Sequence, residues 1–174
     1  MAVTLNETPS GNRLHIGIFG KTNSGKSSFI NTFSGQKVSI VADVAGTTTD
    51  PVYKSMEIYP LGPCVLIDTA GFDDEGELGA LRIEKTSLAA QKTELAIILF
   101  CGDEMVQELK WYNYFKKRQT PVIPVLGKAD LYTQEQKEYL IQMIQKNTGE
   151  TVCPVSSETG EGIRKLKELL TEKI

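Results

Sequence analysis

Residues 20–27 carry the most specific chemical pattern in the chain: they read GKTNSGKS and match G-x-x-x-x-G-K-[ST]. When such a loop follows a strand and opens a helix, its backbone N–H groups cradle the phosphates of a nucleotide. Lys26 is predicted to contact the β- and γ-phosphates, and the Ser27 hydroxyl to ligate Mg²⁺. The helix N-terminus adds favourable potential for an anion. The remaining predicted phosphate-binding residues of this loop are Ser24, Gly25 and Ser28.

A second phosphate-directed pattern, D-T-A-G, occupies residues 68–71 at the end of an apolar run. Asp68 is predicted to hold Mg²⁺ through a water molecule. Gly71 can offer its N–H to a γ-phosphate oxygen because no Cβ blocks the approach. Three consecutive threonines, 47–49, lie in an earlier long loop, and Thr48 is favoured to close over Mg²⁺. Loss of the γ-phosphate would release both loops, which describes an order–disorder switch.

A third pattern predicts which base is recognised. Gly127-Lys128-Ala129-Asp130 follows an apolar run, and a carboxylate placed there can accept two hydrogen bonds from the N1 and N2 edge of guanine. Adenine lacks this pair of donors, so it would leave Asp130 unpaired at a cost of about 1–3 kcal/mol or more. The Lys128 stem can pack over the base. The loop after the last apolar run is expected to brace the base through backbone N–H groups of Ser156, Ser157 and Glu158.

The hydrophobic pattern predicts the elements that must position these loops. Short apolar runs indicate strands at 14–19, 52–59, 64–69, 95–101, 121–126 and 151–155, and helical periodicity indicates helices at 25–34, 81–92, 104–117, 133–146 and 162–173. Strands and helices alternate, which is typical of an α/β fold. The turn-rich residues 60–63 predict one antiparallel hairpin. We therefore expect a P-loop NTPase domain: a six-stranded, mostly parallel sheet with one antiparallel strand and helices on both faces.

Composition limits the organisation to one domain. The 174 residues are 40% hydrophobic and 24% charged, with a net charge of −3. Residues 1–13 are interpreted as a flexible N-terminal arm and 14–174 as the folded domain. No basic stripe, apolar leader or membrane-length apolar run is visible, so we expect a cytoplasmic protein that contacts neither nucleic acid nor membrane.

The three cysteines, Cys64, Cys101 and Cys153, are widely spaced and form no C-x-x-C pair. This argues against a disulfide framework and against a self-contained zinc or iron–sulfur site. They are interpreted as buried thiols in a reducing compartment, and a reactive or metal-linked Cys101 is the alternative.

Together these motifs resemble the translation-factor-related GTPases, and within them the era-like and MnmE-like group, over residues 14–174. A finer resemblance, to the GTPase domain of the HydF family of FeFe-hydrogenase maturation proteins, rests on residues 46–56, 61–63 and 68–85. The era-like relatives usually carry arginine at the position of Thr49. This resemblance implies Mg²⁺-dependent binding of GTP and its slow hydrolysis to GDP, as a nucleotide switch in hydrogenase maturation. The implied partners are other maturation proteins and the remaining HydF domains.

The resemblance also implies a route to catalysis. Asn23 matches the P-loop asparagine that helps bind K⁺ beside the phosphates in the MnmE-like group, where the cation can stabilise transition-state charge. Phe72 replaces the glutamine of Ras-like proteins and cannot orient the attacking water. Catalysis would then come from a loop carboxylate, the cation or a second subunit, and the sequence leaves open whether two such domains form a homodimer. The catalytic candidates are Lys26, Thr48, Gly71, Glu75 and Glu77, with Asp73 and Asp74 as alternative carboxylates.

Gly127 departs from the family pattern, which has Asn or Thr at this position. That side chain normally braces the base and the P-loop, and its absence removes roughly 1 kcal/mol or more of hydrogen bonding. We therefore expect weak, micromolar or looser nucleotide affinity, with guanine preference preserved by Asp130.

Three other functions remain open from the sequence. One is a tRNA-modification or ribosome-assembly GTPase of the MnmE or era type. Another is a non-hydrolysing, GTP-sensing adaptor, for which Phe72 and Gly127 give some support. An ATPase is the weakest of the three, because Asp130 has no suitable partner on adenine.

Overall fold

A single six-stranded sheet organises the chain in the computed structural model, which describes residues 13–21, 24–35, 51–59, 61–69 and 85–173. The strand order is β2-β3-β1-β4-β5-β6. β2 pairs with β3 antiparallel, and the other described pairings are parallel. This confirms the predicted sheet and its hairpin. The strands are β1 (Leu14–Phe19), β2 (Val52–Ile58), β3 (Gly62–Asp68), β4 (Leu95–Phe100), β5 (Val122–Leu126) and β6 (Cys153–Pro154).

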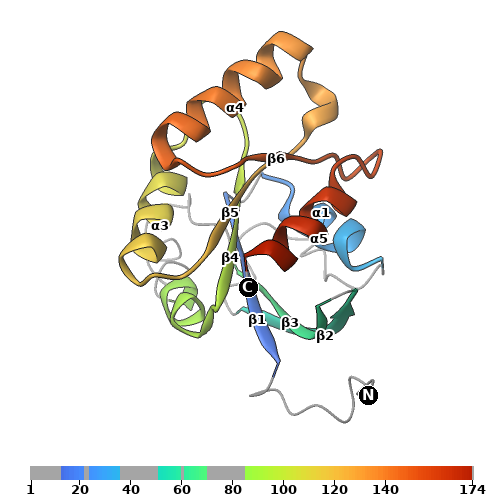
Figure 1. Ribbon diagram of the computed structural model, residues 1–174, viewed down its shortest axis with the longest axis vertical. Helices are drawn as coiled ribbons and strands as arrows, with labels where there is room; N and C mark the ends of the chain where they lie inside the picture. The colour runs from blue at the N-terminus through green and yellow to red at the C-terminus, as the bar shows by residue number, and fades with distance from the viewer. Residues whose placement is uncertain (1–12, 22–23, 36–50, 60, 70–84, 174) are drawn as a thin grey trace.

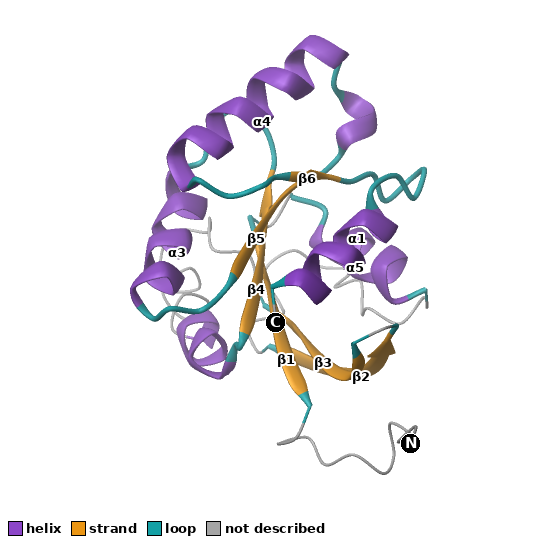
Figure 2. Cartoon of the chain, in the orientation of Figure 1, coloured by secondary structure: helices purple, strands orange, loops and turns teal. Residues whose placement is uncertain are grey.

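Helices cover both faces of the sheet, as Figures 1 and 2 show. One face carries α1 (Lys26–Ser34) and α5 (Ile163–Glu172), and the other carries α3 (Val106–Lys117), α4 (Gln134–Thr148) and the helical residues 85–92. The part of the expected helix before residue 85 lies outside the described ranges. A short 3₁₀ turn, η2 (Ala129–Leu131), follows β5.

Two apolar cores, one on each side of the sheet, hold these layers together. On the α1 and α5 side, the rings of Phe29 and Phe33 stack with centroids 5.5 Å apart, as their i, i+4 spacing predicts. On the α3 side, Phe19 packs against Trp111 and Phe115 with centroid distances of 5.6 and 5.0 Å. All six residues of β4 are buried, because a central parallel strand is covered on both faces.

Element ends agree with the sequence expectations to within two residues; for example, β3 begins at Gly62 rather than at residue 64, and α3 begins at Val106 rather than at residue 104. The capping box of α4 is confirmed: Thr133 Oγ1 accepts from the Gln136 N–H at 3.2 Å, and Gln136 Oε1 accepts from the Thr133 N–H at 2.9 Å. The last strand was expected over 151–155 but comprises only Cys153–Pro154. Pro154 has no N–H, which suits an edge strand, and the Val155 N–H still donates to the Leu126 carbonyl of β5 at 2.9 Å.

Two of the three cysteines are buried thiols of low reactivity. Cys64 and Cys153 are free and buried, and burial raises the pKa of each to about 11. This confirms the buried-thiol interpretation for these two residues. Cys101 is partly exposed, and its Sγ accepts a hydrogen bond from the Tyr132 hydroxyl at 3.8 Å. Among the described helices, none is both long enough and apolar enough to cross a membrane.

Candidate functional site

The predicted phosphate and base motifs come together at one edge of the sheet. β1, β3, β4, β5 and β6 run parallel, so their carboxyl ends meet there, where ligands of α/β proteins bind. A cavity of about 320 Å³ lies between the loop after β1 and the loops after β5 and β6. Its lining residues are Ser24, Gly25, Ser28, Phe29, Leu99, Gly127, Lys128, Asp130, Leu131, Val155, Ser157 and Glu158.

The P-loop is held in shape by its own short contacts. Gly25 has φ 86°, a left-handed conformation that favours glycine, and it caps the N-terminus of α1. A Cβ on Gly20 would lie 2.6 Å from Ser24 Oγ, so only glycine fits there without a shift. Ser24 Oγ in turn donates to the Lys21 carbonyl at 2.7 Å. The first turn of α1 carries no acidic side chain, so its N-terminus can accept an anion.

Lys26 joins the P-loop to the end of β3. Its side chain is buried, and its ammonium donates to the carbonyl of Thr69. The Thr69 hydroxyl donates to the Ile18 carbonyl at 2.7 Å, which ties this point back to β1. Burial raises the pKa of the neighbouring Asp68 carboxyl, and the positive charge of Lys26 acts in the opposite direction. The structure therefore brings together two motifs that the sequence places far apart.

The residues at this junction suit a magnesium ion. Ser27 lies in the first turn of α1 and Asp68 ends β3, so these two elements carry a hydroxyl and a carboxylate, respectively. These are hard oxygen donors, which Mg²⁺ prefers, and this ion usually keeps several waters. Accordingly, no group of three His, Cys, Asp or Glu side chains gathers as a metal site within the described ranges.

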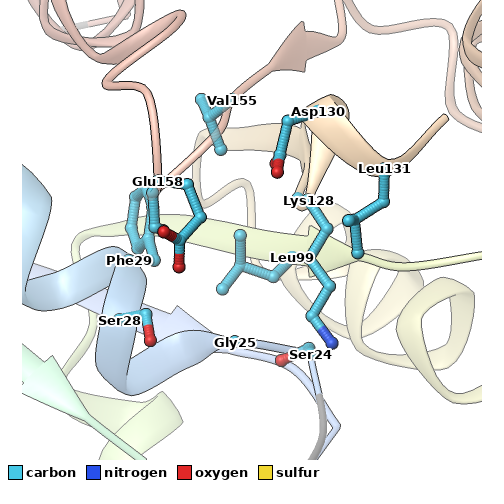
Figure 3. Close-up of a pocket in the computed structure, with 12 residues that line it drawn as sticks. Ser24, Gly25, Ser28, Phe29, Leu99, Lys128, Asp130, Leu131, Val155 and Glu158 are labelled. Carbon is cyan, nitrogen blue, oxygen red and sulfur yellow. The ribbon is translucent and has the colours of Figure 1, made fainter.

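Lys128 connects the base loop to the P-loop. Its backbone has φ 56° and ψ 38°, a left-handed conformation that is uncommon for a residue other than glycine. Such strained residues gather at functional sites. Figure 3 shows its side chain extending from the base loop towards Ser24. Its Cε would lie 3.5 Å from a Cβ on Gly25, so the stem covers one side of the cavity.

Asp130 is fixed by a neighbouring hydroxyl. Ser156 Oγ, on a fully buried residue, donates to Asp130 Oδ1 at 2.8 Å. This bond orients the carboxylate and leaves lone pairs on both oxygens for further donors. In Figure 3 the carboxylate of Asp130 faces the cavity from the side opposite Ser24 and Ser28.

The loop after β6 differs in one respect from expectation. The Ser156 N–H was expected to brace the base, but it donates to the Glu161 carbonyl at 2.9 Å. Ser156 therefore contributes through its side chain, because its N–H is used to close the loop. Ser157 and Glu158 line the cavity, and bracing of the base by their N–H groups stays a prediction. The Ser157 carbonyl accepts a hydrogen bond from Thr32 Oγ1 at 3.1 Å, which links this loop to α1.

Sequence reasoning missed the apolar walls of the cavity. Phe29, Leu99 and Val155 are buried residues that also belong to the core on the α1 side, and Leu131 lies at the exposed rim. Core and ligand-facing residues have the same apolar character, so hydrophobic pattern alone cannot separate them. The usable signal is position, because Leu99 precedes the end of β4 and Val155 immediately follows β6.

Several predicted site residues cannot be placed. They lie outside the described ranges and stay predictions: Asn23, Thr48, Gly71, Glu75 and Glu77, together with Phe72 and the alternative carboxylates Asp73 and Asp74.

Gly127 faces the P-loop at the position where the family pattern has a side chain. Its N–H donates to the Phe100 carbonyl at 2.9 Å. A Cβ here would lie 3.4 Å from the Ser24 carbonyl oxygen and 3.7 Å from Leu99 Cδ2, so a small adjustment would accommodate it.

The sheet, the P-loop and the Lys128–Asp130 base loop together define a P-loop GTPase domain. Residues 15–128, more than half of the chain, match the family described as 50S ribosome-binding GTPase. The chain belongs to this family.

Curated relatives include two kinds of bacterial GTPase. GTPase Der of Wolinella succinogenes is 36% identical over 173 residues, covering 94% of this chain and 36% of that protein. The tRNA modification GTPase MnmE of Nitrosomonas eutropha is 30% identical over 177 residues, covering 98% of this chain and 38% of that protein. The chain thus spans little more than a third of the length of these relatives.

Solved structures agree with the family. Era from Aquifex aeolicus, bound to GDP·AlF₄⁻, superposes with a TM-score of 0.80 at 25% identity, covering 92% of this chain and 56% of that chain. A second Era structure, in complex with MgGDPNP and nucleotides 1506–1542 of 16S ribosomal RNA, gives a TM-score of 0.79 at 26% identity, covering 91% and 56%.

Replacing Gly127 by Asn is expected to tighten GDP binding about fivefold, because the amide can hydrogen-bond the facing P-loop and add about 1 kcal/mol. Isothermal titration calorimetry with GDP measures the effect. Gly149→Asn is the matched control, since Gly149 is a left-handed cap of α4 far from the cavity. Equal affinity of Gly127→Asn and the unmodified protein would show that the missing side chain does not limit binding.

Proposed function

We propose that this chain binds GTP with Mg²⁺ and hydrolyses it slowly to GDP and phosphate, acting as a nucleotide switch. The observation that carries the proposal is the 2.8 Å hydrogen bond from Ser156 to Asp130, which aims a carboxylate into the cavity opposite the P-loop. A phosphate cradle alone would suit any nucleotide. A fixed acceptor at the other end of the cavity selects guanine, which offers two donors to it.

In this proposal the chain contributes mainly positioning and electrostatic stabilisation, as is usual for phosphoryl transfer. The P-loop amides and the N-terminus of α1 hold the phosphates, and the Lys26 ammonium offsets their charge. Ser27 and Asp68 would hold Mg²⁺, which when bound neutralises charge on the β- and γ-phosphates. Lys128 and the apolar walls Phe29 and Leu99 would enclose the base.

Slow turnover follows from Phe72, which has no group able to orient the attacking water. Thr48 and Gly71 are proposed to hold the switch loops closed on the γ-phosphate. Glu75 and Glu77 are proposed as candidates for assisting hydrolysis. Asn23 is proposed to support a K⁺ ion that stabilises transition-state charge.

Asp130→Asn should move base preference from guanine towards xanthine. Xanthine carries a carbonyl where guanine carries its 2-amino group, so an amide can donate to it while a carboxylate cannot. We expect GDP affinity to fall about 10- to 100-fold and xanthosine diphosphate affinity to rise. Calorimetry with both nucleotides measures this, with Glu172→Gln on the exposed surface of α5 as control. Lys26→Ala should weaken both nucleotides alike. GDP binding unchanged in Asp130→Asn would refute the proposed base recognition.

Phosphate release from GTP should be faster in potassium than in sodium at equal ionic strength, and Asn23→Ala should remove the difference. The reason is that a cation beside the phosphates can substitute for an arginine finger. Asn113→Ala, on the exposed surface of α3, is the control. Stimulation retained by Asn23→Ala would exclude that residue from the cation site, and absence of hydrolysis in both salts would favour the GTP-sensing adaptor.

For the wider role, we propose an RNA-linked GTPase of the Der, MnmE and Era type. The family match, the relatives named as a tRNA modification GTPase, and the Era structure that holds 16S ribosomal RNA support this proposal. The sequence expectation of no nucleic-acid contact rests on a net charge of −3 without a basic stripe. An RNA-linked role is compatible with the missing basic stripe if the RNA is contacted by a partner or by residues beyond this domain. The Era chain, for example, extends well past the part that this chain matches.

Hydrogenase maturation is the second candidate, and the sequence of residues 46–56 favours it. None of the relatives named above is a hydrogenase maturation protein, so this assignment stays a prediction.

The two roles predict different losses in cells that carry the whole gene with Lys26→Ala or Asp130→Ala. The RNA-linked role predicts a defect in ribosome profiles or in tRNA modification, because the switch can no longer cycle. The maturation role predicts loss of FeFe-hydrogenase activity with normal ribosomes and tRNA. Sucrose-gradient profiles, tRNA nucleoside analysis and a hydrogenase assay on the same strains distinguish them. A phenotype identical to the parent in all three would contradict both.

A further inference from the structure

Lys21 occupies a variable position of the P-loop motif, and its side chain forms ion pairs with two carboxylates, those of Glu104 and Glu108. Its ammonium donates to the Glu104 carbonyl oxygen at 2.6 Å and also contacts the Glu104 carboxylate. It forms a further ion pair with Glu108 Oε2 at 3.2 Å. The printed contacts of the Lys21 side chain are thus with the segment between β4 and α3 and with the first turn of α3.

Glu108 is an unusual partner because it is completely buried. The residue has 0% exposure in the first turn of α3, and neither carboxylate oxygen makes a well-aligned hydrogen bond within the described residues. Burial raises the pKa of Glu108, and the charge of Lys21 offsets this only in part. A desolvated carboxylate is costly unless a cation is held close to it. The position of Lys21 is thus tightly constrained by Glu108.

Lys21 stays positively charged in this setting. Burial lowers its pKa, but the hydrogen bond to Glu104 and the charge of Glu108 outweigh that effect, so the pKa lies above its ordinary value. Two carboxylates share this one ammonium. Its charge is therefore matched locally and is not directed at the phosphates.

The segment between β4 and α3 also contacts the base loop. The Gly102 N–H donates to the Tyr132 hydroxyl oxygen at 2.9 Å, and that hydroxyl donates to Cys101 Sγ at 3.8 Å. Tyr132 is the C-cap of η2, the turn that contains Asp130. One connection thus touches the P-loop through Lys21 and the base loop through Tyr132. Gly127 has no side chain that could join the P-loop and the base loop directly. The contacts of Lys21 and Tyr132 with this segment join the two loops indirectly.

We propose that Lys21, paired with Glu104 and Glu108, is a positioning residue of the nucleotide site. It anchors the start of the P-loop to the segment between β4 and α3 and so keeps the loop's N–H groups aimed at the phosphates. That the ligand is a guanine nucleotide rests on the proposed function, whereas the ordering of the P-loop by Lys21 does not.

The test compares Lys21→Met, Lys21→Arg, Glu108→Gln and the double variant Lys21→Met/Glu108→Gln. Lys110→Met is the matched control, because Lys110 is an exposed lysine on α3, the helix that carries Glu108. Three measurements are made: GDP and ADP affinity by calorimetry, hydrogen–deuterium exchange of residues 20–28 without nucleotide, and unfolding in urea. Should Lys21→Met fail to fold, Glu108→Gln carries the test.

Lys21→Met should weaken GDP binding about tenfold with the GDP-to-ADP preference unchanged, because the phosphates and not the base lose their support. Exchange should rise in residues 20–28 and stay unchanged in α4. Lys21→Arg should bind within about twofold of the unmodified protein, since it keeps the charge and the donors. The double variant should recover part of the stability lost in urea, because a neutral amide at position 108 requires no counter-charge, but it should not recover GDP affinity, because the anchor is still missing.

Two results would overturn the proposal. One is unchanged GDP affinity and unchanged exchange at residues 20–28 in Lys21→Met. The other is a rise in exchange spread evenly over the domain, in step with the loss of stability in urea, which would indicate a purely structural ion pair. If the unmodified protein binds no guanine nucleotide, the proposed function fails by itself. The hydrogen–deuterium exchange of residues 20–28 without nucleotide then tests whether Lys21 orders the P-loop.

Discussion

The buried ammonium of Lys26 is the point on which the architecture of the site depends. It reaches from the first turn of α1 to the carbonyl of Thr69, beyond the end of β3. This contact is available only because β1 and β3 are parallel neighbours in a register that pairs Ile18 with Asp68. A cation placed between two strand ends needs anionic or carbonyl oxygen around it, because its desolvation is otherwise expensive. The parallel sheet supplies that environment and fixes where a phosphate can be held.

Local patterns in the sequence predicted the fold well. The i, i+4 pair Phe29 and Phe33, the capping box at Thr133 and the turn-rich hairpin depend on neighbouring residues, and all three are confirmed. The short β6 was not foreseen. How far an edge strand pairs depends on its neighbour as well as on its own composition.

The site was predictable where its chemistry resides in contiguous motifs. Lys26, Asp68 and Asp130 come from such motifs, and the structure gathers them at one edge of the sheet. Two other roles could not be assigned beforehand. The Ser156 hydroxyl orients Asp130, and the Glu108 carboxylate fixes the position of Lys21. Each contact joins residues far apart in the chain, and each depends on a rotamer that only packing decides. A single sequence carries no record of such pairings.

The two outer strands of the sheet have unequal consequences for assembly. β6 offers only two residues, and one of them is a proline that cannot donate to an added strand. β2 has seven residues and the outermost place at the other end of the strand order. Its side chains include Tyr53 and Glu57, which are exposed and lie on the same face of the strand. Within the part of the chain that the structure describes, growth of this sheet by strand addition, whether from the same polypeptide or another, is therefore directed to the β2 border, away from the base-recognition loops.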